Sequence, residues 1–346
     1  MNVEKKVSGS LNKCYSMAEL DYKDRHCFLV AAEKQDPCYL FDEQGNKLET
    51  VWEKPGGVMT MQQVPGSDGQ FLATQKFYSP NDSAEAFIAV VTPKEEGWTV
   101  EKIVDAPFVH RFGILPVNGI NHLIVCTLKS DHEYKNDWRY PGAVYTAILP
   151  DSLEGASVVL KPLKTGLLKN HGFSVYEGQA VVGTENGTFL FTPPETPDGE
   201  WKEKLLLDIP SSDSILLDFD GDGQLELGSI APFHGNSLTI YHLDEHGRYV
   251  PQWKYERPEA ETEMIHATWA GMIAGKPVWT VGWRKGTRNT ILIFWDPETG
   301  TYKTQEIDHN TGAANLMHFV NEKGEDILVA TNREVDQIAM FTIKGE

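Results

Sequence analysis

The segment Trp98-Thr-Val-Glu-Lys-Ile-Val104 shows a pattern that recurs along the chain and predicts its fold. It begins with an aromatic residue and then alternates apolar with polar side chains, as a half-buried β-strand does. Copies lie roughly 45 to 59 residues apart, which is about the length of a four-stranded propeller blade. Closer copies are Trp201-Lys-Glu-Lys-Leu-Leu-Leu207 and Tyr302-Lys-Thr-Gln-Glu-Ile307, and looser ones begin near Lys47, Ser157 and Tyr249.

Short apolar strands separated by turn residues fill the space between these copies, as in 179–183 and 188–191. The pattern predicts an all-β fold, a seven-bladed β-propeller formed by one domain over 1–346. The last blade lacks a fourth strand, and residues 2–7 supply it beside 337–343, which closes the ring. An irregular pair of β-sandwich sheets is the alternative. The predicted blades are 15–53, 57–105, 107–164, 168–209, 213–256, 262–308 and 312–346.

Composition restricts the partners of this 346-residue chain. It has 31 Lys and Arg against 50 Asp and Glu, a formal charge of −19. Such a chain is a poor ligand for nucleic acid or for an anionic membrane, because both are bound mainly through Lys and Arg. The polar first ten residues show no export signal, and the four cysteines form no CxxC pair. We expect a cytoplasmic protein with free thiols.

An acidic turn, Asp218-Phe-Asp220-Gly-Asp222-Gly-Gln224-Leu-Glu226, presents alternating oxygen ligands around two glycines. It resembles the calcium loops of FG-GAP and VCBS-type propeller repeats, and an Asp/Gly-rich hairpin without an ion is the alternative. The loop joins a first to a second strand, so we expect it on the face opposite the ligand site. The predicted structural Ca²⁺ ligands are Asp218, Asp220, Asp222, Gln224 and Glu226.

The opposite face is predicted to gather the cations of this acidic chain. An anionic ligand is favoured there because Arg binds carboxylates in a bidentate manner and a cleft focuses the field. We therefore expect a small anionic carbohydrate, with Trp138, Trp269 and Trp283 as sugar platforms or simply as packing residues. Residues 130–140 form an inserted loop on this rim. The predicted substrate-binding residues are Lys76, Lys129, Arg139, His234, Arg284, Arg288, Arg333, His266 and His318.

Histidines recur at the entrances of the predicted inner strands, notably in His110-Arg-Phe-Gly-Ile114 and His171-Gly-Phe-Ser-Val175. Converging inner strands bring such positions near the axis. Neutral imidazoles there can ligate a transition metal or act as acid and base near pH 7. A structural role for each histidine is the alternative.

The His-x-Phe entrances, the rim Arg and Lys residues, the Tyr- and Arg-bearing insertion and the DxDxDG loop together resemble those of seven-bladed uronate-sugar lyases. Oligogalacturonate, ulvan and rhamnose–glucuronate lyases and the propeller of aldos-2-ulose dehydratase are the comparisons. The resemblance implies β-elimination on a uronate-containing or oxidised sugar. That chemistry needs a cation at the carboxylate, a base and an acid.

The predicted catalytic residues follow these three roles. Arg111 neutralises the carboxylate, with Arg139, Arg284 and Arg288 as other candidates. His110 or His171 is the base, and Tyr140 or Tyr134 is the acid. If His110, His171, His266 and His318 instead hold a transition metal, the ion becomes the electrophile and Lys76 or Lys129 the base.

Two other functions remain open at this stage. One is a non-catalytic propeller that binds an anionic sugar or a protein, and the other is a metal-dependent sugar dehydratase or isomerase. The chain has no GxGxxG, GxxxxGK[ST], HExxH or GxSxG motif. The sequence leaves the substrate and the oligomeric state open.

Overall fold

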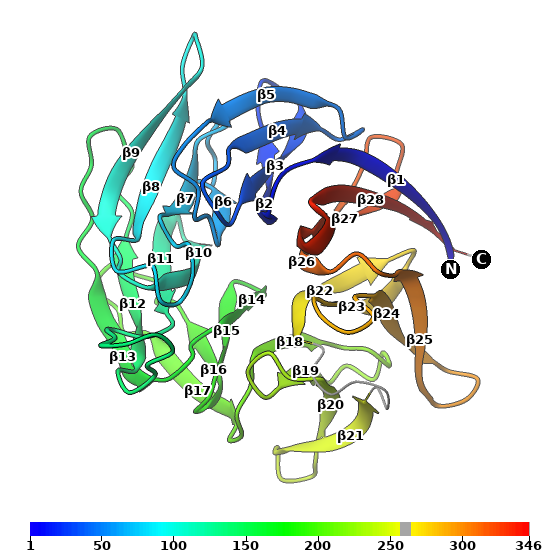
Figure 1. Ribbon diagram of the computed structural model, residues 1–346. Helices are drawn as coiled ribbons and strands as arrows, with labels where there is room; N and C mark the ends of the chain where they lie inside the picture. Colours follow the sequence, from blue (N-terminus) through cyan, green and yellow to red (C-terminus); the bar gives the residue numbers. More distant parts are fainter. Residues whose placement is uncertain (257–263, 346) are drawn as a thin grey trace.

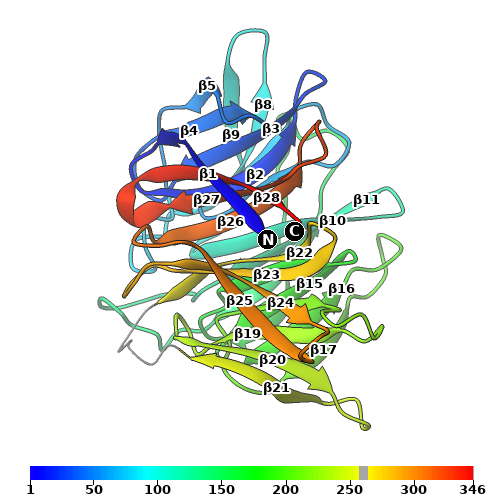
Figure 2. The same ribbon diagram turned by 90° about the vertical axis from the view of Figure 1, so that its right-hand side faces the viewer.

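Seven antiparallel sheets of four strands surround a central axis in the computed structural model, which describes residues 1–256 and 264–345 (Figure 1). Figure 2 shows the same ring from the side. The prediction of an all-β, seven-bladed propeller is confirmed. The seven predicted spans overlap the sheets one to one, although residues 262, 263 and 346 lie outside the described part of the chain.

Each sheet runs from an inner strand beside the axis to an outer strand at the periphery. The inner strands are β2 (Cys14–Asp21), β6 (Met61–Gln63), β10 (Val109–Val117), β14 (Gly172–Tyr176), β18 (Asp213–Leu217), β22 (Ile265–Ile273) and β26 (Ala313–Val320). The second strands are β3 (His26–Ala32), β7 (Phe71–Gln75), β11 (Ile120–Thr127), β15 (Gln179–Thr184), β19 (Glu226–Ala231), β23 (Lys276–Trp283) and β27 (Asp326–Asn332).

The remaining strands complete the blades. The third strands are β4 (Cys38–Asp42), β8 (Phe87–Pro93), β12 (Gly142–Ile148), β16 (Gly187–Thr192), β20 (Ser237–Leu243), β24 (Thr290–Asp296) and β28 (Gln337–Lys344). The outer strands are β5 (Lys47–Trp52), β9 (Trp98–Asp105), β13 (Lys161–Leu167), β17 (Lys202–Leu207), β21 (Tyr249–Glu256), β25 (Thr301–Asp308) and β1 (Asn2–Ser10). A short 3-10 helix, Arg333–Val335, precedes β28.

The repeated aromatic segments become outer strands, as β9, β17 and β25 show. One looser copy is shifted, because β13 begins at Lys161 and not near Ser157. The reason is packing: Val158 is buried, and its amide donates a hydrogen bond to the carbonyl of Ile103 in the preceding blade. Second strands such as β15 and β27 are almost fully buried, since each blade packs between two others and buries both faces.

The N-terminal strand closes the ring as predicted. β1 pairs antiparallel with β28, from Asn2 opposite Lys344 to Ser10 opposite Gln337, with a bulge after Val7. The Lys5 ammonium forms a 2.7 Å ion pair with Asp308 of the neighbouring blade. The closure thus covers the edge of β28.

The expectation of free thiols is confirmed. All four cysteines are buried free thiols. In the described residues, no helix combines the length and hydropathy that a membrane-spanning segment requires.

Candidate functional site in the axial channel

Buried polar side chains meet where the inner strands begin. His110 is the second residue of β10, His171 directly precedes β14, and His266 is the second residue of β22. The ring centroids of His110 and His171 are 4.3 Å apart, and those of His171 and His266 are 5.2 Å apart. His234 joins them from the loop between β19 and β20, with its ring centroid 4.7 Å from that of His171. The prediction that strand-entrance histidines converge near the axis is confirmed for His110, His171 and His266, and His234, predicted as a loop residue of the substrate site, joins them.

A buried carboxylate orients the central imidazole. The Nδ1 atom of His171 lies 3.0 Å from Oδ2 of Asp213, which also accepts a hydrogen bond from the Ser212 hydroxyl. On the other side of the ring, His171 Nε2 lies 3.1 Å from His234 Nε2. Asp213 therefore fixes the direction in which the second nitrogen of His171 points.

His266 and His110 are oriented by backbone carbonyls. His266 Nδ1 donates to the carbonyl of Ala314 at 2.8 Å, and His110 Nδ1 donates to the carbonyl of His171 at 3.2 Å. A carbonyl only accepts, so the neutral ring carries its proton on Nδ1 and its lone pair on Nε2. The lone pair of His266 accepts a hydrogen bond from the Tyr15 hydroxyl at 3.1 Å.

Burial sets the charge states of this cluster. It holds the pKa of His110, His234 and His266 well below the usual value, so these imidazoles are neutral at pH 7. Burial alone would raise the pKa of Asp213, but His171 and Arg111 outweigh it and hold that pKa below its usual value. Burial also raises the pKa of Tyr15 to about 12, so its hydroxyl keeps its proton.

The same cluster has the geometry of a metal site. His171, His234 and His266 each offer one ligand atom, and these atoms all lie within 4.8 Å of one another. Tetrahedral zinc with Zn–N bonds of 2.0–2.1 Å would separate its nitrogens by about 3.3 Å. The 3.1 Å distance between His171 Nε2 and His234 Nε2 is close to that separation.

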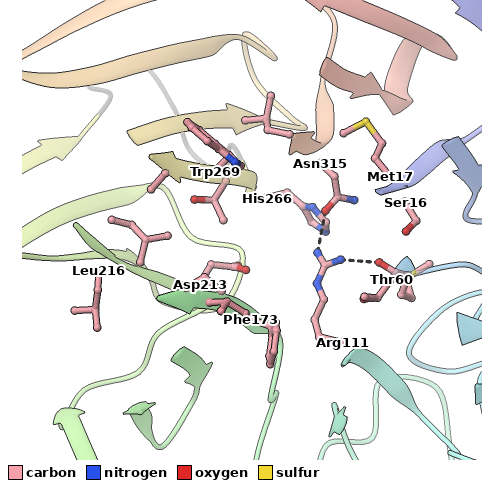
Figure 3. A pocket seen from close by; sticks show the side chains of 17 residues that line it. Ser16, Met17, Thr60, Arg111, Phe173, Asp213, Leu216, His266, Trp269 and Asn315 are labelled. Atoms are coloured by element: carbon pink, nitrogen blue, oxygen red, sulfur yellow. Dashed lines mark hydrogen bonds between the residues drawn. The ribbon is translucent and has the colours of Figure 1, made fainter. Parts of the chain in front are cut away.

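A cavity of about 320 Å³ lies beside the cluster in the channel (Figure 3). Arg111 reaches into it and donates hydrogen bonds to the carbonyl of Met59 at 2.6 Å and to Asn315 Oδ1 at 3.0 Å. Both acceptors are neutral, so neither of them neutralises the guanidinium. Asp213 and His266 also line the cavity.

The cavity continues away from the face on which a ligand was predicted. Its walls include Val175, Leu216 and Trp269, which lie further along their inner strands. A more open cavity shares Val175 and Trp269 and reaches Glu19 and Gln63 near the far ends of β2 and β6. On the opposite side Phe233 stacks on His234 at 3.9 Å, and Trp138 packs on Phe233 at 5.7 Å. These rings cover the histidine cluster.

The predicted cationic rim is largely neutralised by carboxylates. Arg284 donates to Glu334 at 2.7 and 2.9 Å, and Arg333 pairs with Glu33 and Glu334. Acidic side chains from neighbouring blades pair with these two predicted substrate-binding arginines. Lys76 pairs with Glu85, and Lys129 donates to the carbonyl of Asp137 inside the insertion. The backbone carbonyl of Arg288 accepts hydrogen bonds from the amides of Thr311 and Gly312.

The insertion holds its own charges and lies outside the cavity walls. Arg139 pairs with Asp137 at 2.7 Å and with Glu133 at 2.8 Å, and the Tyr140 hydroxyl donates to Glu133. The exposed Tyr134 ring lies under Arg139. The prediction that Tyr140 or Tyr134 donates a proton at the axial site is therefore not supported by their positions.

Two further predicted positions differ. His318 lies near the far end of β26, where its Nε2 is 2.8 Å from Asp326, so it does not join the axial cluster. Trp283 is fully buried in the core and offers no sugar platform, whereas Trp269 lines the cavity.

The acidic turn lies between β18 and β19, as predicted. Asp220, Asp222 and Glu226 gather their oxygens there. Asp218 accepts hydrogen bonds from the amides of Gly221 and Gly223, and Gln224 donates to Asp222.

Tyr15 and Asp213 are the functional residues that sequence reasoning missed. Both stand at the entrances of inner strands, β2 and β18, in positions equivalent to those of the histidines. Alignment of the strand entrances by blade is the signal that would have found them.

The fold and the axial cluster define the chain as a seven-bladed β-propeller with a buried histidine-rich channel. No protein-family model and no curated protein sequence matches it. Among solved structures it is similar to one titled "Streptogramin B lyase structure", with 14% identity, a TM-score of 0.57 and coverage of 98% of this chain and 97% of that one. It is also similar to the Cps50 (Swd1) β-propeller domain of Myceliophteria thermophila, with 10% identity, a TM-score of 0.58 and coverage of 99% and 100%. At these identities the likeness shows the fold alone.

Proposed function

We propose that this protein is a lyase that eliminates an oxygen leaving group from a small uronate-containing or oxidised sugar in the axial cavity. The observation that carries the proposal is the pairing of Arg111 with the oriented His266 imidazole in one cavity. Among the described residues the Arg111 guanidinium donates to two neutral oxygens, while His266, whose lone pair is on Nε2, lines the same space.

The chemistry divides among three side chains. Arg111 binds the substrate carboxylate and stabilises the negative charge that develops when the adjacent C–H bond breaks. His266 takes that proton, and the electron pair forms the double bond as the C–O bond breaks. Tyr15 is not a wall of the cavity and its hydroxyl bonds to His266 Nε2, so the mechanism requires this hydroxyl to turn from the imidazole and donate its proton to the leaving oxygen.

The Tyr15–His266 contact then restores both groups. After elimination His266 is an imidazolium and Tyr15 a phenolate, and the two atoms are already hydrogen-bonding partners at 3.1 Å. Transfer of the proton from Nε2 to the phenolate returns the starting state. This assignment replaces Tyr140 with Tyr15 as the acid, and His266 joins His171 and His110 as a base candidate.

A second candidate, a metal-dependent sugar dehydratase or isomerase, is supported by one observation. His171, His234 and His266 have the spacing of a transition-metal site, with Asp213 as the partner that orients His171. An ion there would act as the electrophile. Lys76 and Lys129 are poor bases for this version, since their ammonium groups contact Glu85 and the Asp137 carbonyl.

Turnover of a panel of uronic-acid oligosaccharides and oxidised sugars tests the lyase. Elimination creates a conjugated unsaturated uronate, which is followed by its ultraviolet absorbance. Tyr15→Phe removes only a hydroxyl and should lower kcat by about 10²–10⁴ with a nearly unchanged KM. His309→Ala changes an exposed histidine that directly follows β25, so it is the control and should leave turnover unchanged.

The same assay separates the alternatives. Activity that disappears with a chelator and returns with Mn²⁺ or Zn²⁺ would favour the metal-dependent version. If the folded protein turns over nothing in the panel, yet binds an acidic sugar with an affinity that Arg111→Met abolishes, the lyase proposal is overturned in favour of a non-catalytic binding propeller. The four buried free thiols fit the reducing cytoplasm that we propose as the location.

A further inference from the structure

The acidic turn between β18 and β19 contains a buried carboxylate oxygen, Oε1 of Glu226, to which none of the described residues donates a hydrogen bond. Glu226 is fully buried, and its Oε2 accepts a hydrogen bond from the amide of Phe219 at 2.6 Å. Its other oxygen, Oε1, is buried and accepts no hydrogen bond. Burying such an oxygen without a partner is costly, so a group other than a backbone amide must compensate its charge.

His242 faces this oxygen from β20, the next strand of the same sheet. Its Nε2 lies 3.1 Å from Glu226 Oε1, 3.5 Å from Asp222 Oδ2 and 3.8 Å from Asp220 Oδ2. Its Nδ1 points to the carbonyl of Leu243 at 3.4 Å, which favours the proton on Nδ1. In that tautomer a lone pair on Nε2 faces three carboxylates, and a cation bound between them would satisfy both the imidazole and the carboxylates.

The turn is built to hold these oxygens in place. Both carboxylate oxygens of Asp218 accept hydrogen bonds from loop amides, those of Gly221 at 2.8 Å and Gly223 at 3.1 Å. Both glycines have positive φ angles, 77° and 85°, which allow the tight path. Asp218 therefore shapes the loop, while one ligand atom each of Asp220, Asp222, Glu226 and His242 lies within 4.8 Å of the others.

We propose that Asp220, Asp222, Glu226 and His242 form a site for a divalent first-row transition ion of the Mn²⁺ or Zn²⁺ class. Calcium takes six to eight oxygen ligands, whereas an imidazole nitrogen suits transition ions. Both oxygens of Asp218 accept hydrogen bonds from loop amides, whereas Asp220 Oδ2 and Asp222 Oδ2 face His242, the latter while also accepting from the Gln224 side-chain amide. The ion joins the β18–β19 turn to β20 and thereby fastens the end of a strand that lines the channel.

Cobalt titration of the purified full chain tests this site. Because the axial histidines also favour first-row ions, every protein in the test carries His234→Ala. The metal-free protein should bind one equivalent of Co²⁺ with visible absorption bands, and Zn²⁺ should displace it while a large excess of Ca²⁺ does not. The melting temperature should rise as the ion binds.

Two variants locate the ion. His242→Ala and Glu226→Gln should each weaken Co²⁺ binding by more than about tenfold. His246→Ala is the matched control, since this exposed histidine lies in the turn after the same strand and should bind Co²⁺ unchanged. If a variant does not fold, the spectrum and the displacement series of the His234→Ala protein still decide.

Two results would overturn the proposal. Displacement of Co²⁺ by Ca²⁺ at similar concentrations, with His242→Ala affecting neither ion, would make the turn an oxygen-only calcium loop. If no ion binds or raises the melting temperature, the turn holds no metal and the proposal is wrong.

Discussion

Equivalent positions at the strand entrances carry different chemistry in each blade. His171, Asp213 and His266 stand at the start of successive inner strands. Asp213 orients the imidazole of His171, whereas a backbone carbonyl, that of Ala314, orients His266. Burial lowers the pKa of His266, and His171 and Arg111 outweigh burial to hold the pKa of Asp213 below its usual value. At the scale of the residue, the site is a set of mutually dependent side chains, and no member can be assigned a role alone.

Glu334 offers a test of electrostatics at this scale. Burial tends to raise its pKa, but Arg284 and Arg333 outweigh burial and hold the pKa below its ordinary value of 4.5. Glu334→Gln should therefore cost about 1–2 kcal/mol of unfolding free energy at pH 7. A depressed pKa in the folded state means that this contribution is present above about pH 4.5 and is lost as the pH falls through the folded value.

Urea unfolding of both proteins between pH 7 and pH 3 measures the difference. Glu85→Gln, which breaks the exposed pair with Lys76, is the control and should change little at any pH. A Glu334→Gln difference that stays constant down to pH 3 would contradict the assignment.

Strands at each radius have a distinct environment. Second strands such as β15 and β27 are buried along almost their whole length, while outer strands such as β17 expose most side chains. This gradient explains why the outer strands gave the alternating pattern that revealed the repeat. It also explains why the central strands read as continuous apolar runs.

The closing strand can be tested as an element. Deleting residues 1–10 removes β1 and leaves the edge of β28 open to pairing with another molecule. We expect a lower urea midpoint and concentration-dependent association, measured by unfolding and by size-exclusion chromatography. Lys6→Ala keeps the strand and should behave as the full chain does. A truncated protein with an unchanged midpoint and elution volume would show that β1 contributes nothing.

Charge acts on the molecule as a whole. The chain carries a net −19, so its surface repels itself even though many individual cations are paired. Screening by salt weakens both the repulsion and the exposed ion pairs, and the repulsion involves far more charge pairs.

We therefore expect the melting temperature at pH 7.5 to rise by a few degrees between about 20 mM and 500 mM sodium chloride. Near the isoelectric point of about 5.0 the net charge vanishes, and the same salt step should have little effect. A melting temperature that falls with salt at pH 7.5 would mean that the exposed ion pairs contribute more than the repulsion.

Local patterns were sufficient to predict the blades and their closure. Strand alternation and turn residues each involve only a few neighbouring residues, so they can be recognised in the sequence. Residues 2–7 could be assigned as the closing strand because their local pattern resembles that of 100–104. The convergence of His110, His171 and His266 followed from the same reasoning, because topology alone sends strand entrances to one place.

Which polar groups meet across blades depends on the tertiary packing of the blades. Arg333 pairs with Glu33 although they are 300 residues apart, and Tyr15 reaches His266 across 251 residues. No sequence spacing encodes such contacts, since they depend on how far each blade tilts and how far each side chain extends. The same applies to His242, which faces the acidic turn because β20 lies beside β19. The sequence by itself determined the propeller, and the packing of its blades determined the chemistry of its channel.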